Sequence, residues 1–284
     1  MPLSIVARVM LALAGLALAW LKPAGAADPP QRIASFNVCA DQLVVALADP
    51  GQIVGLSPYA SDPAISVIAD KARAYPKLAL QAEAMVPLQP DLVLVGTWDR
   101  PLTQRMLRSL GFRVVGVDVV SDIAAGIAQI REIAKLIGHP ERGEALIADI
   151  EAARRRLASA PRPKSLSALL VGNSGYTVGP DSLAGALLRE AGLAPPPGAP
   201  AGYGGYVPLE KLIMLRPDFL VMASVVETPD GQGALYLTHP ALRALYPPDK
   251  RIVLPSRFTL CAGPSLVAAF DYLADVLTRI APPK

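Results

Sequence analysis

Cys39 and Cys261 are the only two cysteines among the 284 residues. Cys39 lies in FNVCADQ (36–42) and Cys261 lies in TLCAGPS (259–265), and each follows a short apolar run and precedes a helix-like segment. Two thiols form a disulfide in an oxidising compartment, whereas two thiolates bind soft or borderline metal ions. Which chemistry applies depends on whether the fold brings the two segments together.

The other reactive side chains form no pattern that is typical of an enzyme. The two histidines, His139 and His239, each precede a proline, as in a turn, and neither has a partner at metal-ligand spacing. The glycine-rich segment GNSGYTVG (172–179) matches neither a phosphate-binding loop nor a nucleophile elbow, and no Cys-x-x-Cys occurs. We therefore do not expect an enzyme, and we expect no intrinsic cofactor.

The first 26 residues predict a signal peptide. Arg8 precedes an apolar run, and Ala24-Gly25-Ala26 forms a small-x-small cleavage site. The alternative is an uncleaved anchor, but the run of about 13 residues is shorter than the roughly 20 that span a bilayer. Cleavage would remove two of 27 basic residues and none of 24 acidic ones, which leaves 25 − 24 = +1. We expect an exported protein in an oxidising compartment with no electrostatic drive towards nucleic acid.

Short apolar runs alternate with longer helical patterns along the rest of the chain. This alternation predicts an α/β fold with parallel sheets. The near-continuous apolar run DLVLVG is typical of a strand that is buried on both faces. The predicted strands are RIASF (32–36), QIVGLS (52–57), DLVLVG (91–96), RVVGVD (113–118), SLSALLVGN (165–173), DFLVMA (218–223) and RIVLPS (251–256).

A helical region interrupts this alternation in the middle of the chain. Residues 122–160 carry helical periodicity and no strand signal, with a break at His139-Pro140. We interpret this region as a connector between two α/β lobes. The predicted organisation is a signal peptide (1–26), an N-terminal lobe (27–121), a helical connector (122–163) and a C-terminal lobe (164–284).

Two segments repeat without gaps at a distance of 127 residues. EAMVPLQPDLVLVG starts at Glu83 and EKLIMLRPDFLVMA starts at Glu210, and in both a Pro-Asp pair precedes a buried-strand pattern. A short helix must end before each proline, because proline disfavours helical geometry in the preceding residue. Each glutamate stabilises the first turn of that helix through the helix dipole. Because both lobes carry a copy, we expect two related lobes with a ligand cleft between them.

The ordered set of these segments, together with the long mid-chain helix and the ending SLVAAFDYLADVL, resembles the helical-backbone class of periplasmic substrate-binding proteins. These proteins serve ABC importers of iron–siderophore complexes, vitamin B12 and haem. The resemblance implies two Rossmann-like lobes joined by one long helix, with a metal chelate as the transported ligand in a shallow cleft. It also implies that Glu83 and Glu210 dock onto arginines of a membrane permease dimer. The protein itself is expected to be a monomer.

Ligand contacts in this family come from loops that follow strands. Trp98 could offer a flat surface to a chelate or pack over the sheet edge, and Arg257 could pair with an anionic ligand group or with a neighbouring carboxylate. The Pro- and Gly-rich segment 194–208 could be a mobile loop or present its tyrosines to the ligand. The positions that match ligand contacts are Asn37, Cys39, Tyr59, Trp98, Arg100, Tyr176, Tyr203, Tyr206, Arg257 and Cys261.

Within this fold the cysteines have three alternative roles. They form a disulfide across the lobes, they face the ligand as soft-metal thiolates, or they are two unrelated buried thiols. The main alternative function is a periplasmic metal-binding scavenger that uses Cys39 and Cys261 and has no transporter. Such a scavenger would not need the paired glutamates.

Overall fold

The computed structural model describes residues 28–161, 166–223 and 232–281. The predicted signal peptide lies outside these residues. Among the described helices, none combines the length and apolar character needed to cross a membrane.

The N-terminal lobe is built on a parallel four-stranded sheet with the order β2-β1-β3-β4. Helix α2 (Val38–Leu47) follows the first strand, and Asn37 caps it by accepting hydrogen bonds from the backbone N–H groups of Cys39 and Ala40. Helix α4 (Pro101–Ser109) connects the third and fourth strands. The strands are β1 (Ile33–Ser35), β2 (Ile53–Gly55), β3 (Leu92–Gly96) and β4 (Val114–Val117), and the short helical turns are η2 (Pro50–Gln52), η3 (Pro58–Ser61), α3 (Ala69–Ala72) and η4 (Glu83–Met85).

The C-terminal lobe contains a parallel three-stranded sheet with the order β5-β8-β9 and a separate antiparallel pair, β6-β7. The strands are β5 (Ala168–Leu170), β6 (Tyr176–Val178), β7 (Gly204–Tyr206), β8 (Phe219–Met222) and β9 (Arg251–Val253). The helices are α7 (Leu183–Glu190), α8 (Leu209–Leu215), α9 (Gln232–Thr238) and α10 (Pro240–Leu245), with short turns at η5 (Asn173–Gly175), η6 (Pro248–Lys250) and η7 (Ser256–Phe258).

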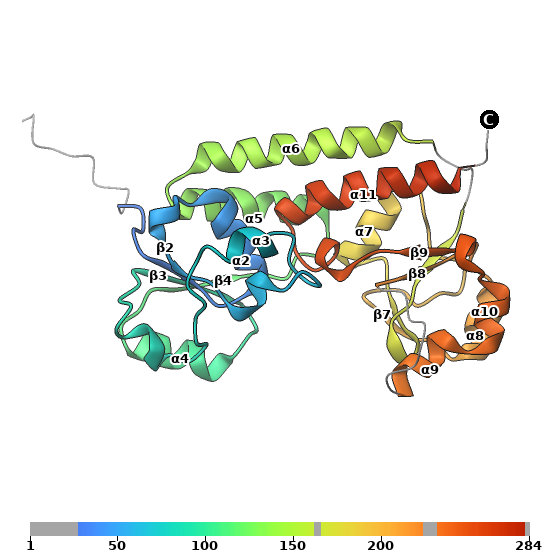
Figure 1. The fold of residues 1–284 in the computed structure, drawn as a ribbon, viewed down its shortest axis with the longest axis horizontal. Helices are drawn as coiled ribbons and strands as arrows, with labels where there is room; N and C mark the ends of the chain where they lie inside the picture. Colours follow the sequence, from blue (N-terminus) through green and yellow to red (C-terminus); the bar gives the residue numbers. More distant parts are fainter. Residues whose placement is uncertain (1–27, 162–165, 224–231, 282–284) are drawn as a thin grey trace, which may run out of the picture.

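Three long helices cover both lobes on one side. They are α5 (Ile123–Leu136), α6 (Pro140–Ser159) and α11 (Pro264–Ile280), and α6 runs along the top of both lobes in Figure 1. Helix α6 packs on α5 and α11. It is also tied to α11 by the ion pair of Arg156 with Asp271 (Nε to Oδ1, 2.8 Å) and to α7 by Arg154 with Glu190 (Nη2 to Oε1, 2.8 Å). The predicted fold of two α/β lobes joined by one long helix is confirmed, while the predicted lobe limits stay predictions.

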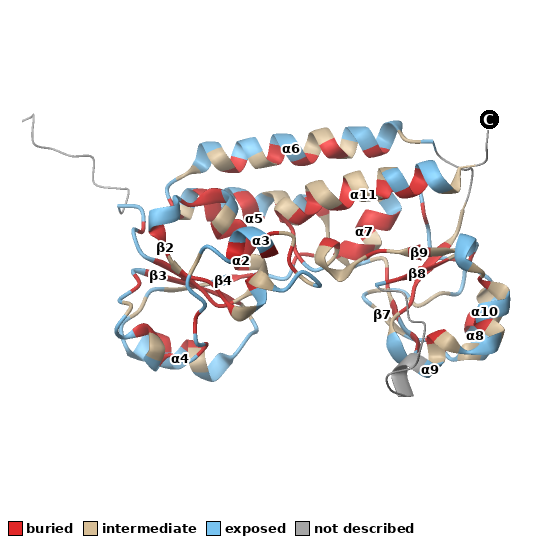
Figure 2. Cartoon of the chain, viewed as in Figure 1, coloured by how far each residue is buried: buried red, intermediate tan, exposed pale blue. Residues whose placement is uncertain are grey.

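The inner strands of the two parallel sheets are buried on both faces, as the apolar strand sequences predict (Figure 2). In β3, Leu92 and Leu94 point to the core beneath the long helices, whereas Val93 and Val95 point to a second core within the N-terminal lobe. The C-terminal sheet alternates in the same way between the shared core and a core of its own. One continuous apolar core therefore joins the two lobes under α6 and α11, which resists movement of one lobe against the other.

The sequence repeat is also a structural repeat. Gln89 and Arg216 precede the repeated prolines, and both have a left-handed backbone, with φ of 42° and 43°. The following aspartates, Asp91 and Asp218, accept hydrogen bonds from the segment that leads into the first strand of their own lobe. The helix before the proline differs in length, because the first copy is the 3₁₀ turn η4 and the second is the α-helix α8.

The sequence prediction missed the antiparallel pair β6-β7, whose second strand lies in the segment interpreted as a mobile or ligand-contacting loop. The strand reads Gly-Gly-Tyr and lacks the β-branched residues that predict strands. Gly204 has φ of +116°, and a Cβ atom there would lie 2.0 Å from the carbonyl oxygen of Thr177. Only glycine permits this approach of the two strands.

Candidate functional site

Cys39 and Cys261 join the two lobes by a disulfide, with their Cα atoms 5.1 Å apart. Cys39 lies in the first turn of α2 and Cys261 lies three residues before α11, and these two helices pack together. Gly126 of α5 makes room for this junction, because a Cβ atom there would lie 2.6 Å from the Cβ atom of Ala262. The predicted disulfide is confirmed. The predictions of soft-metal thiolates and of unrelated thiols are wrong, because both sulfurs are used in the S–S bond.

Arg257 makes a second contact between the lobes. Its Nη1 donates a hydrogen bond to the carbonyl oxygen of Pro63 (3.2 Å), and its guanidinium lies 4.9 Å from the centre of the Phe258 ring. Within the described residues it forms no ion pair with a carboxylate, so that interpretation of Arg257 is not supported. The disulfide and this hydrogen bond bring the loop after β9 against the N-terminal lobe.

The loops after β1 and β3 are held together by amide and carboxylate groups. Asn37 Nδ2 donates to Asp99 Oδ2 (2.6 Å), while its Oδ1 accepts from the Cys39 backbone N–H (2.8 Å). Gln104 Nε2 of α4 donates to the backbone oxygen of Asp99 (2.6 Å). Asn37 is therefore a positioning residue for the loop after β3, and both ends of its amide are occupied.

Three predicted contact residues of the N-terminal lobe lie in the loops after β2 and β3. Arg100 Nη2 donates to the hydroxyl oxygen of Tyr59 (3.5 Å), which links the two loops. Trp98 is 83% exposed, a fraction that does not fit packing over the sheet edge. Because the carboxyl ends of parallel strands share one edge of the sheet, these side chains gather at the same edge as Asn37 and Cys39.

The tyrosines of the C-terminal lobe lie on the β6-β7 pair. Tyr176 and Tyr206 are partners across the two strands, with ring centroids 5.3 Å apart in an edge-to-face arrangement. Tyr203 directly precedes β7, and all three rings are exposed. The β6-β7 pair follows β5, so it too extends from the carboxyl end of the C-terminal parallel sheet.

Comparisons with known proteins agree with this arrangement. Residues 33–224 match the family of periplasmic binding proteins. The chain belongs to the periplasmic binding protein family. A cobalamin-binding protein of Halobacterium salinarum is 29% identical over 170 residues, which cover 57% of this chain and 45% of that relative, so the alignment spans less than half of the relative.

Solved structures of periplasmic binding proteins share the whole fold. A periplasmic heme binding protein from Pseudomonas aeruginosa superposes with a TM-score of 0.70 at 25% identity, covering 90% of this chain and 95% of the other. The periplasmic vitamin B12 binding protein BtuF of Vibrio cholerae superposes with a TM-score of 0.64 at 17% identity, covering 88% and 97%. The second likeness shows the fold alone.

Asp41 is a buried ionisable group of this periplasmic binding protein that the sequence prediction missed. It lies on α2, two residues after Cys39, and accepts hydrogen bonds from the Ser57 backbone N–H (3.0 Å) and hydroxyl (2.5 Å). Burial raises the pKa of Asp41 to about 6, against the opposing effect of hydrogen bonds from Ser35 and Ser57. The Ser57 hydroxyl also accepts from the Tyr59 backbone N–H (3.2 Å), so Asp41 positions the loop that carries Tyr59. The available signal was the pair of polar residues, Asp41 and Gln42, inside the otherwise apolar segment ADQLVVAL.

Glu83 and Glu210 occupy equivalent exposed places in the first turns of η4 and α8. The core of the N-terminal lobe joins η4 to α4 through Met85 and Leu107. Helices α4 and α8 lie at the ends of the two lobes that point away from α6 (Figure 1). Neither glutamate forms an ion pair with a described residue, so both carboxylates remain available to a partner.

Both histidines have structural roles, as their sequence context predicts. His139 precedes α6 and its Nε2 contacts Gln52 Oε1 (2.9 Å), while His239 Nδ1 accepts from the Ala241 backbone N–H at the start of α10 (3.2 Å). Across the described part of the chain, no group of three or more His, Cys, Asp or Glu side chains could hold a metal ion.

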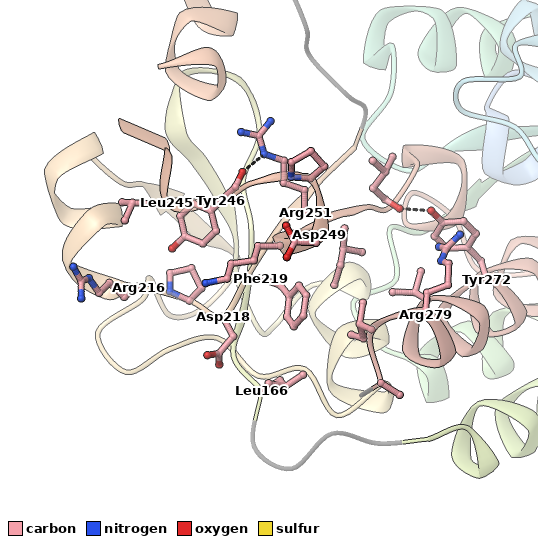
Figure 3. A pocket seen from close by; sticks show the side chains of 18 residues that line it. Leu166, Arg216, Asp218, Phe219, Leu245, Tyr246, Asp249, Arg251, Tyr272 and Arg279 are labelled. Atoms are coloured by element: carbon pink, nitrogen blue, oxygen red, sulfur yellow. Dashed lines mark hydrogen bonds between the residues drawn. The ribbon is translucent and has the colours of Figure 1, made fainter. Parts of the chain in front are cut away.

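A separate cavity of about 1070 Å³ lies at the opposite edge of the C-terminal sheet, where β8 and β9 begin (Figure 3). Its wall carries charges of both signs, among them Arg216, Asp218 and Arg279. Arg251 Nε on this wall donates to the Tyr246 carbonyl oxygen (2.6 Å). None of the ligand contacts predicted from the sequence lines this cavity, so it is distinct from the candidate site.

Proposed function

We propose that the protein captures a metal chelate of the corrinoid, haem or iron–siderophore type between its lobes and delivers it to an ABC importer. The observation that carries this proposal is the set of exposed aromatic side chains on the carboxyl-end loops of both lobes. The names of the relatives support it, since one is a cobalamin-binding protein and another a heme binding protein. The ligand is cargo, and the protein itself needs no cofactor.

The exposed aromatic rings suit a large flat ligand. Trp98 stands on the N-terminal lobe, and Tyr203 and Tyr206 stand just before and at the end of β7 in the C-terminal lobe. Each of these residues is at least 68% exposed. Exposed rings of this size stabilise a complex mainly by burying apolar area against the ligand. Arg100 is available at the same edge for an anionic substituent of the chelate, since its bond to Tyr59 is long, at 3.5 Å.

The frame around these rings is held in one arrangement. The disulfide joins the start of α2 to the segment that precedes α11. The hydrogen bond of Arg257 and the continuous apolar core reinforce this junction between the lobes. A site with little freedom loses little conformational entropy when a ligand binds. We therefore propose a largely preformed site with limited lobe closure.

Delivery rests on Glu83 and Glu210. Their equivalent positions suit a partner that presents the same surface twice, such as a permease dimer with one cationic side chain for each lobe. The secreted protein would act in the periplasm as a monomer after removal of residues 1–26.

The second candidate is a chelate scavenger without a transporter. The form of this alternative that uses cysteine thiolates does not agree with the disulfide. The repeated glutamates favour the transport function, because a scavenger has no use for two equivalent carboxylates.

The direct experiment is a ligand titration of protein purified from the periplasm. Cyanocobalamin, haemin and a ferric hydroxamate siderophore are added separately, and Trp98 fluorescence and the absorption of the chelate are recorded. Saturable 1:1 binding of one chelate class, weakened by Trp98→Ala and Tyr206→Ser, supports the proposal. Failure of all three classes to bind at about 100 μM would reject it.

A further inference from the structure

Helix α4 exposes a row of apolar side chains that the fold does not use. Leu102, Met106 and Leu110 follow one another at four-residue spacing, so they lie on one face of the helix and its end. They are 72%, 44% and 44% exposed, whereas Gln104 and Leu107 on the inner face are buried. The lobe core is therefore complete without the outer row.

Arginine surrounds this apolar row. Arg105 and Arg108 form a second exposed row at three-residue spacing, and Arg100 and Arg113 lie just beyond the two ends of the helix. No acidic residue occurs from position 100 to position 117. We call Leu102, Met106, Leu110, Arg105 and Arg108 the α4 surface.

The position of α4 leaves this surface accessible. The helix lies at the end of the N-terminal lobe that points away from α6, and its outer side is exposed along its length (Figures 1 and 2). Trp98 precedes Leu102 by four residues and is itself strongly exposed. A partner that covers the α4 surface would therefore approach the lobe from the side opposite the long helices.

We propose that the α4 surface binds the surface of an anionic lipid bilayer. Interfacial amphipathic helices place an apolar row at the boundary between lipid headgroups and acyl chains. Their cationic side chains then lie at the level of the phosphates. The charge complementarity selects an anionic surface. It also disfavours a second copy of this chain, because two α4 surfaces would bring like charges together.

This inference goes beyond the proposed function, because it requires neither the chelate nor the permease. Binding to the bilayer would confine the protein to two dimensions near the membrane. A short apolar row with a few arginines gives weak and reversible attachment, since stable anchoring requires further apolar area.

The test is cosedimentation of the purified protein with lipid vesicles. One set contains phosphatidylcholine with about 30 mol% phosphatidylglycerol, and the other contains phosphatidylcholine alone. Binding is expected for the anionic set, with a blue shift of Trp98 fluorescence, and it should weaken as salt is added because the attraction is screened. Leu102→Gln with Met106→Gln, and separately Arg105→Gln with Arg108→Gln, should each reduce the binding constant about tenfold or more.

The matched control is Met214→Gln, which removes an exposed methionine from α8 of the other lobe and should leave vesicle binding unchanged. Chelate titration and thermal unfolding of every variant verify that the fold and the ligand site are intact. The proposal fails if the wild-type protein binds neither vesicle set, or binds both equally. It also fails if Met214→Gln reduces vesicle binding as much as the α4 variants do. A third contradicting result is that the α4 variants abolish a dimer, or abolish binding to the permease in neutral lipid.

Discussion

Asp91 and Asp218, which are 127 residues apart, directly precede β3 and β8 and accept equivalent hydrogen bonds. Asp91 accepts from the backbone N–H groups of Gln31 and Arg32 (2.7 and 3.0 Å), and Asp218 accepts from the Ser167 N–H and hydroxyl (both 2.7 Å). Each aspartate thereby fixes the chain that enters the first strand of its lobe. The two lobes are therefore built in the same way around this aspartate. In both lobes a glutamate, Glu83 or Glu210, lies eight residues before it.

Charge reversal of both repeated glutamates should abolish transport and leave ligand binding intact. Glu83→Lys with Glu210→Lys would place like charges opposite the cationic groups of the permease, and such juxtapositions cost several kcal/mol. Chelate uptake by cells is expected to fall at least about tenfold, while the chelate titration of the purified protein is unchanged. Glu132→Lys, at an exposed position on α5, is the control. Undiminished uptake by the double variant would refute the docking role.

Removal of the disulfide should destabilise the protein strongly. The bond joins residues 222 positions apart, and closing a loop of this length contributes about 5 kcal/mol in the chain-entropy model. Cys39→Ser with Cys261→Ser should lower the free energy of unfolding in urea by an amount of that order. Addition of reductant should lower the free energy of unfolding of the wild-type protein to a value similar to that of the double variant. The value for the double variant itself should not change. A wild-type protein that is indifferent to reductant would show that the cysteines are not joined.

The pairing of the cysteines illustrates what the sequence can and cannot predict. Apolar runs, the Pro-Asp repeat and helical periodicity predicted both lobes and the connecting helix, because these patterns reflect burial on one or two faces. The contact between Cys39 and Cys261 depends on how α2 and α11 pack, and no local pattern encodes that packing. Strand β7 at 204–206 was missed for a related reason, since its two glycines serve a close approach of backbones and carry no strand signal.

The candidate site was predictable as a set of loops but not as a set of contacts. Strand ends identified the segments of Asn37, Trp98 and Tyr176, because parallel sheets gather their carboxyl ends at one edge. The bond between Asn37 and Asp99 and the burial of Asp41 arise from tertiary packing. Both were therefore visible only in the structure.

Asp41 should make the stability of the protein depend on pH in a defined window. Its pKa is raised to about 6 in the folded protein from an ordinary value of 3.8, so the folded state binds the proton more readily than the unfolded state. The contribution of Asp41 to the unfolding free energy should therefore fall as pH rises from about 4 to about 6, by on the order of 2–3 kcal/mol. The Asp41→Asn side chain cannot ionise. The difference in unfolding free energy between the wild-type protein and the Asp41→Asn variant should therefore change by this amount between about pH 4 and about pH 6.

Carboxylates with lowered pKa values, such as Asp49 and Asp218, act in the opposite direction. These carboxylates are present in both the wild-type protein and the Asp41→Asn variant, so their effects cancel in the difference between the two unfolding free energies. A difference that stays constant from pH 4 to pH 7 would contradict the burial of an ionisable Asp41.

Gly204→Ala should disrupt the antiparallel β6-β7 pair that carries Tyr176 and Tyr206. The added Cβ atom would meet the Thr177 carbonyl oxygen at 2.0 Å, and the backbone has a positive φ. We expect a loss of roughly 2 kcal/mol in unfolding free energy and weaker chelate binding, because the tyrosine pair would separate. Gly202→Ala adds a Cβ atom that meets no neighbour within 4 Å and should have a smaller effect on both quantities. Equal effects of the two substitutions would exclude the clash as the cause.

Capture of a metal chelate is tested most directly by titrating the purified, oxidised protein with metal chelates and following Trp98 fluorescence. We expect a corrinoid, haem or ferric siderophore to quench the fluorescence with 1:1 stoichiometry and a Kd in the micromolar range or below. In the complex, Trp98 should be shielded from an aqueous quencher. Absence of saturable binding for every chelate class, or binding that leaves Trp98 as accessible to the quencher as in the free protein, would contradict it.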